Sequence, residues 1–135
     1  MNTSTSDIDV LIIGAGPTGL VLALWLTRMG VRVRIVDTTA EPGTTSRALA
    51  VQARTLELYR QAGLADAVVA RGRKVVAANL WVVGQKVAHA VLGAMGEGVS
   101  PFPYALVYPQ DEHERLLLDR LAAKGTLIDP AIIGA

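Results

Sequence analysis

Three glycines near the amino terminus have the spacing of a turn that binds a pyrophosphate. Gly14, Gly16 and Gly19 follow the apolar run 10–13 and precede an apolar stretch of helical length. The first allows a sharp exit from a strand, the second lets backbone approach a phosphate, and the third lets a helix pack closely on the strand. Unpaired N–H groups at the helix start can bind an anion, and the helix dipole adds about 0.3 to 1 kcal/mol to its stabilisation. The candidate dinucleotide-binding residues of this turn are Gly14, Ala15, Gly16, Pro17, Thr18 and Gly19.

A carboxylate follows at the distance expected for a ribose ligand. Arg28 and Gly30 mark the end of the helix, and residues 31–36 alternate like a second strand that stops at Asp37. Asp37 lies 23 positions after Gly14. Because an ionised Asp accepts a hydrogen bond from a ribose 2′-hydroxyl and repels a 2′-phosphate, it favours FAD or NAD over NADP in this site.

Two other interpretations compete for the same stretch. From Ile8 to Leu26 the chain is almost entirely apolar, as a membrane span or a signal peptide is. Three glycines and a proline interrupt this run and no basic residue precedes it, so a buried strand and a buried helix explain the composition better. The second alternative is a glycine-rich turn in an unrelated α/β fold.

Length and composition indicate one globular domain. The chain has 135 residues, of which 51% are hydrophobic and 19% charged. The formal charge of only +1 shows no excess of basic residues of the kind that binds nucleic acid. There is no cysteine, which excludes disulfides and thiolate metal sites, and two histidines are too few for a metal cluster, so no metal is expected. Without a targeting or membrane segment, the expected location is cytoplasmic.

The remaining chain divides into segments that would position these groups. Residues 1–7 are expected to form a flexible start and residues 38–46 a loop. Helices are expected from about Thr55 to Gly63, over 65–71, and from Gln110 or Asp111 to Gly125. Residues 74–92 contain two strand-like runs and are expected to form an antiparallel hairpin that turns at 84–86. A further parallel strand is expected near Ile128. Trp25 and Trp81 are expected to be core residues.

Four stretches of the chain form a combination more specific than the glycine turn alone. They are residues 14–19, Asp37, the segment from Ser46 to Glu57, and the segment from Pro103 to Glu114. Together they resemble the amino-terminal part of the FAD-dependent aromatic-ring hydroxylases, the single-component flavoprotein monooxygenases typified by p-hydroxybenzoate hydroxylase and polyketide hydroxylases. The resemblance implies an α/β fold: a Rossmann-like FAD-binding domain with a parallel sheet and helices, plus part of an antiparallel sheet on the substrate side.

The resemblance also implies roles for single residues. Asp37 would bind the adenosine ribose, although the family commonly has Glu there. Arg47 and Arg54 would lie near the phosphates or the ribityl chain, and Gln110 would hydrogen-bond the ribityl chain or the ring. The alternatives are that the two arginines are solvated charges and that Gln110 only opens a helix. The hairpin at 74–92 would begin the substrate-facing sheet.

The activity implied by the resemblance is hydroxylation of a small aromatic compound with FAD as cofactor and with NAD(P)H and O2 as co-substrates. No catalytic side chain is expected, because the flavin supplies the chemistry while the protein positions it and excludes water.

The sequence departs from the family in one respect. Family members run to several hundred residues and carry later Asp-Gly and Gly-Asp motifs, which this sequence lacks. We therefore expect residues 1–135 to be the amino-terminal part of an incomplete FAD-binding domain, either truncated or split. The alternative function is a non-catalytic nucleotide-binding remnant or one half of a two-chain assembly. The chain alone is expected to be marginally folded, or to associate with itself or with a complementing chain.

Overall fold

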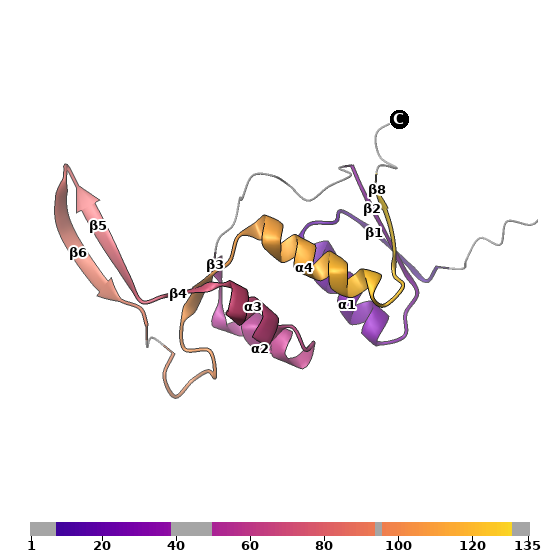
Figure 1. Cartoon of the computed structure of the whole chain (residues 1–135), viewed down its shortest axis with the longest axis horizontal. Helices are drawn as coiled ribbons and strands as arrows, with labels where there is room; N and C mark the ends of the chain where they lie inside the picture. Colours follow the sequence, from indigo (N-terminus) through magenta and orange to yellow (C-terminus); the bar gives the residue numbers. More distant parts are fainter. Residues whose placement is uncertain (1–7, 39–49, 94–95, 131–135) are drawn as a thin grey trace, which may run out of the picture. The chain divides into compact units, whose positions relative to one another are not determined.

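The chain divides into two compact units in a computed structural model, which describes residues 8–38, 50–93 and 96–130 (Figure 1). The first unit contains residues 1–46 and 110–135, and the second contains residues 47–109. The second unit is therefore inserted into the sequence of the first. Each unit has its own secondary structure and its own buried side chains.

The first unit is built on a parallel sheet with helical crossovers. Its strands stand in the order β1-β2-β8, with Ile12 opposite Ile35 and Ile35 opposite Ile128. Parallel neighbours need a crossover connection. One helix joins β1 to β2, and a second helix leads into β8. The elements are β1 (Val10–Ile13), α1 (Pro17–Arg28), β2 (Val33–Asp37), α4 (Gln110–Ala122) and β8 (Leu127–Pro130). This arrangement confirms the predicted α/β class.

One face of this sheet packs against the helices. Helices α1 and α4 lie on the same side of the strands in Figure 1. Most of the buried side chains come from alternate strand positions and from one stripe of each helix, which is the expected pattern for a core between a sheet and helices. They include Ile12, Val33 and Ile35 from the strands, Leu20, Ala23 and Leu24 from α1, and Leu116, Leu117 and Leu121 from α4. Val36, which follows Ile35 on β2, is also buried.

The opposite face of β1 is exposed. Leu11 and Ile13 point away from Ile12, and their exposed fractions are 52% and 71%. Parallel sheets are normally covered on both faces because their strands are apolar on both sides. Within the part of the chain that the structure describes, no element covers this face of β1.

The second unit combines two short helices with a small antiparallel sheet. The sheet has the order β3-β7-β4, and Leu106 at its centre is fully buried. Leu106 packs directly on Gly72, where a Cβ would lie 2.6 Å from its side chain. Leu56, Tyr59 and Val68 from the helices are also buried, as is Leu64, which lies between the two helices. The elements are β3 (Ala50–Val51), α2 (Ala53–Gln61), α3 (Ala65–Arg71), β4 (Arg73–Val75) and β7 (Ala105–Val107).

The predicted hairpin at 74–92 differs from the observed one at both its start and its turn. Residues 73–75 form β4 and pair with β7, so the hairpin contains only β5 (Ala77–Val82) and β6 (Gln85–Val91). Its turn is Val83–Gly84, with φ angles of 49° and 74°, rather than 84–86. Positive φ at both positions gives the turn a twist that matches the strands, as two-residue hairpin loops require.

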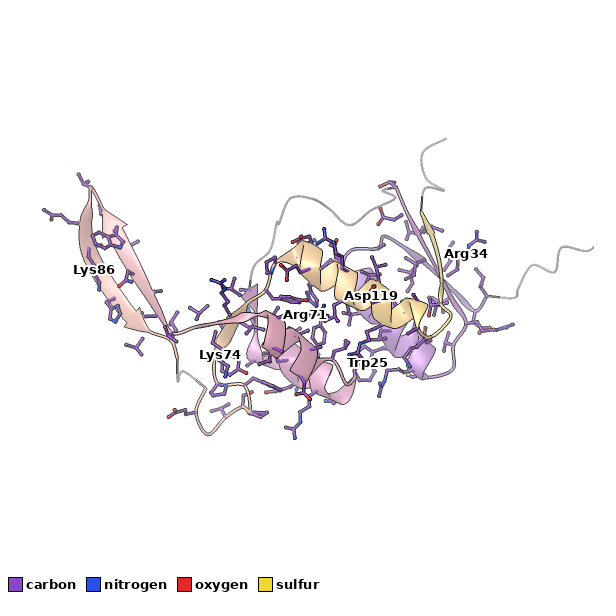
Figure 2. All side chains as sticks on the ribbon, viewed as in Figure 1. Trp25, Arg34, Arg71, Lys74, Lys86 and Asp119 are labelled. Carbon is purple, nitrogen blue, oxygen red and sulfur yellow. The ribbon has the colours of Figure 1, made fainter. Side chains whose placement is uncertain are left out.

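The hairpin is a two-stranded ribbon with no covering layer among the described residues. Its side chains, including the labelled Lys86, project to both sides in Figure 2, and every residue of β6 is exposed. Trp81 has an exposed fraction of 61%, so the expectation that it is a core residue was wrong. The expectation failed because a tryptophan is buried only where a second layer is present. Trp25 is half-buried on α1, with the Arg28 guanidinium 5.8 Å from its ring centre.

Candidate dinucleotide site

The glycine-rich turn joins β1 to α1 at the carboxyl end of the sheet. Gly14 has φ +107°, a conformation that side-chain-bearing residues rarely adopt. Its N–H donates to the Val36 carbonyl at 2.8 Å, which ties the turn to β2. Ligands of open α/β sheets bind at this edge, outside the carboxyl ends of the strands.

The start of α1 has the features of an anion site. Gly16 is the residue that precedes the helix, and no side chain caps the helix there. Pro17 occupies the first helical position, and the first turn contains no acidic residue that would repel an anion. A Cβ built on Gly16 meets no atom within 4 Å, so the space beside this backbone is open. A phosphate can therefore approach the N–H groups of the first turn.

Gly19 has the opposite environment. A Cβ at this position would collide with the Gly14 carbonyl oxygen and would lie 3.3 Å from Cγ2 of Ile12. Helix α1 thus rests on the turn and on β1 at a distance that only glycine permits. Gly14, Gly16 and Gly19 therefore satisfy three different constraints: a backbone angle, an open approach and a close helix contact.

Asp37 ends β2 beside this turn. Its Oδ2 atom accepts a hydrogen bond from the Ala15 N–H at 2.5 Å, and the side chain is half-buried. A carboxylate has about four acceptor positions, so it can accept from more than one donor. The structure thus brings Asp37 together with residues 14–19. The contact with Ala15 was not foreseen from the sequence, because strand periodicity does not show which backbone amide a carboxylate meets.

Of the two arginines implicated by the resemblance, the structure describes only Arg54. Arg47 lies outside the described residues. Arg54 lies on α2 in the second unit, where its Nη1 donates to Glu57 Oε2 at 2.9 Å. Glu57 also accepts from Ser100 Oγ at 2.8 Å, and the hydrogen bonds from Ser100 and then Arg54 lower the Glu57 pKa. A cofactor role for either arginine stays a prediction.

Gln110 opens α4 in the first unit and is engaged with a buried carboxylate. Its Nε2 donates to Glu114 Oε1 at 2.7 Å, and the exposed fraction of Glu114 is only 6%. The neighbouring His113 is also buried, and burial lowers the pKa of its imidazole. Glu114 was part of the resembling segment, but its amphipathic helix gave no signal of a role. Burial of a charged side chain depends on what the helix packs against, which the sequence does not state.

Among residues 8–38, 50–93 and 96–130, no three His, Asp or Glu side chains gather in a way that could hold a metal ion. None of the helices in that part of the chain combines the length and the apolar character needed to cross a membrane.

Comparison with known proteins identifies the family. Residues 7–131 match the family described as FAD binding domain. The chain is 48% identical over 121 residues to 6-methylpretetramide 4-monooxygenase of Streptomyces rimosus, and the match covers 90% of this chain and 22% of that protein. It is 38% identical to rifampicin monooxygenase of Rhodococcus hoagii, covering 87% of this chain and 23% of that one.

A solved structure agrees with these matches. Aklavinone-11 hydroxylase, in a ternary complex with FAD and aklavinone, superposes with a TM-score of 0.83 at 31% sequence identity. The superposition covers 97% of this chain and 26% of the hydroxylase. The chain spans about a quarter of the length of these relatives. It belongs to the FAD binding domain family, and it corresponds to one segment of the flavin-dependent monooxygenases in which that domain occurs.

Proposed function

We propose that this chain is the FAD-binding portion of a monooxygenase that hydroxylates aromatic compounds with NAD(P)H and O2. The observation that carries the proposal is the turn between β1 and α1, where an open approach at Gly16 and an uncapped helix start lie beside the Asp37 carboxylate. This set fits the ADP half of FAD. The turn and the helix start suit the pyrophosphate, and the carboxylate suits the adenosine ribose.

Each residue of the candidate site has one task in this proposal. The N–H groups of the first turn of α1, including those of Thr18 and Gly19, bind phosphate oxygens. Asp37 accepts from the ribose while it also holds Ala15. Gln110 hydrogen-bonds the flavin side of the cofactor, and Arg47 and Arg54 neutralise its phosphates. Bound FAD would supply the redox and oxygen chemistry, and these residues supply its position.

The substrate class follows from the relatives. The matched enzymes are named for 6-methylpretetramide, rifampicin and aklavinone, so we propose an aromatic, polyketide-like substrate for the complete assembly. A cytoplasmic location, where reduced nicotinamide nucleotides are made, agrees with this proposal. The hairpin β5–β6 would face that substrate. The second candidate function is nucleotide binding without turnover, as a remnant or as one half of a two-chain assembly, and the quarter-length match favours it for the chain alone.

A titration with FAD tests the proposal. The purified chain should bind FAD with saturable quenching of flavin fluorescence and a shift of the visible absorption bands. Consumption of NAD(P)H on addition of an aromatic polyketide would assign the activity to this chain alone. Flavin binding without consumption selects the nucleotide-binding alternative. Absence of binding to both FAD and ADP overturns the proposal.

Asp37→Ala should weaken FAD binding by roughly 1 to 3 kcal/mol, because a hydrogen bond to a charged group is lost. We expect the parent chain to prefer ADP over 2′-deoxy-ADP, and the variant to lose this preference. Competition of both nucleotides against FAD measures it. If both nucleotides weaken equally, Asp37 acts only by holding Ala15 and does not bind the ribose.

The matched control for this variant is Asp9→Ala. Asp9 precedes β1 and accepts from the Arg32 N–H at 3.0 Å, so it also joins β1 to β2 through a carboxylate. Its ion pair with Arg32 is solvent-exposed, and the hydrogen bonds from Arg32 lower the Asp9 pKa to about 2. Because Asp9 lies at the amino end of the sheet, its removal should leave both nucleotide affinities unchanged.

The isolated chain should associate in solution through its uncovered sheet surfaces. Apolar area is exposed at Leu11 and Ile13 on β1 and at Leu80 and Trp81 on the hairpin, and a two-stranded ribbon is marginal by itself. Light scattering after size exclusion should give a mass above the 14.2 kDa monomer. Threonine substitutions of one pair at a time should identify the surface that associates. A sharp, cooperatively unfolding monomer would contradict this prediction.

A further inference from the structure

We propose that Glu114 is a positioning residue that fixes the orientation of the Gln110 side-chain amide. This inference rests on the proposed function, in which Gln110 faces the flavin side of FAD. The residue at issue is a carboxylate that is almost fully buried in the first unit and whose Oε1 atom lies 2.7 Å from Gln110 Nε2. Nothing in the proposed binding of FAD uses this carboxylate directly.

The chemistry of the two side chains determines the orientation. An ionised carboxylate only accepts hydrogen bonds, whereas an amide has an NH2 donor on one side and a carbonyl acceptor on the other. Glu114 therefore selects the NH2 side of Gln110 and turns the carbonyl Oε1 away from itself. The spacing of four residues places the two side chains next to each other on α4, so the contact needs no distortion of the helix.

The electrostatic setting supports a fixed arrangement. Glu114 is the fifth residue of α4 and is almost fully buried. His113 beside it is buried, and burial lowers its pKa and so favours the neutral imidazole. A buried charge needs a hydrogen-bonded partner, and Gln110 provides one. The hydrogen bond from Gln110 therefore offsets part of the cost of burying the carboxylate and also holds the two side chains together.

The consequence concerns the cofactor. One N–H of Nε2 donates to Glu114, so the second N–H and the carbonyl Oε1 of the Gln110 amide are held in fixed directions. The groups that an amide held in this way would meet on the flavin side of FAD are the ribityl hydroxyls or the polar atoms of the ring. ADP lacks both groups. Loss of the orientation should therefore weaken FAD binding while it leaves ADP binding intact.

The test compares FAD and ADP affinities of four variants of the full chain. Glu114→Met removes the acceptor at similar size, and Gln110→Ala removes the oriented amide. Each should weaken FAD about tenfold, the usual value of one hydrogen bond, and leave ADP within twofold. The double variant should be no weaker than either single one. Glu114→Gln keeps an acceptor oxygen and should recover most of the FAD affinity.

Asp111→Asn is the matched control. Asp111 also pairs with the residue four positions along α4, since Arg115 Nη1 lies 3.2 Å from its Oδ2, but Arg115 is exposed. This variant should change neither affinity. Equal loss of FAD and ADP in Glu114→Met would show that Glu114 only supports α4, and unchanged FAD affinity would show that the amide orientation is irrelevant; either result overturns the inference. If the parent binds neither nucleotide, the proposed function fails, and this inference fails with it.

Discussion

Gly16→Val should fold as the parent chain does and bind FAD on the order of 100-fold more weakly. The built Cβ at this position meets no protein atom within 4 Å, so the substitution has room in the free chain. The branched side chain fills the space through which a pyrophosphate would approach the start of α1. Loss of one or two hydrogen bonds to a charged phosphate accounts for roughly 3 kcal/mol, or about 100-fold.

The measurement pairs a binding titration with a folding control. Far-UV circular dichroism and thermal unfolding of Gly16→Val should match the parent, while FAD and ADP titrations should both lose affinity. Gly16→Ala, with a smaller side chain in the same space, should fall between the two. A folded Gly16→Val that binds FAD with unchanged affinity would remove this turn from the proposed site.

Gly19→Ala should instead destabilise the first unit, by roughly 3 kcal/mol. Its Cβ would collide with the Gly14 carbonyl oxygen, and the contact is with backbone, which cannot rotate away as a side chain can. Overpacking of this kind costs about 1 to 3 kcal/mol and occasionally more. In a unit of this size the midpoint of thermal unfolding should fall by about 10 °C or more.

Thr18→Ala is the control for this variant. Thr18 precedes Gly19 on α1 and its side chain is exposed, so its truncation should change the free energy of unfolding by about 0.5 kcal/mol or less. Calorimetry of the three chains makes the comparison. Equal unfolding midpoints for Gly19→Ala and the parent would contradict the close packing of α1 on the turn. The two glycine variants together separate binding from folding within a turn of six residues.

The fold of the first unit was largely predictable because its signals are local. The three glycines, Pro17 at the first helical position and the alternation before Asp37 each report on a few neighbouring residues. The extended segment near Ile128 was also anticipated, and it pairs with β2. Local sequence is informative here because the backbone angle at Gly14 and the contact at Gly19 admit few other residues.

What the sequence did not reveal depends on distant neighbours. Residues 74 and 75 were predicted to start the hairpin, but they belong to β4 and pair with β7, some 30 residues later. Val83 adopts a positive φ that its residue type disfavours, because the hairpin register requires it. The buried Glu114 and the bond from Ala15 to Asp37 likewise depend on tertiary packing. The residue types of the candidate site were thus easier to predict than the hydrogen bonds that join them.

The insertion of the second unit between β2 and β8 affects the order in which the parallel sheet can form. Strands β1 and β2 are separated by about 20 residues, whereas β2 and β8 are separated by about 90. The entropic cost of closing a flexible loop grows with the logarithm of its length, so the second pairing costs roughly 1.3 kcal/mol more. The β1-α1-β2 motif should therefore form first. During synthesis, β2 then remains an unpaired edge while the whole second unit emerges from the ribosome.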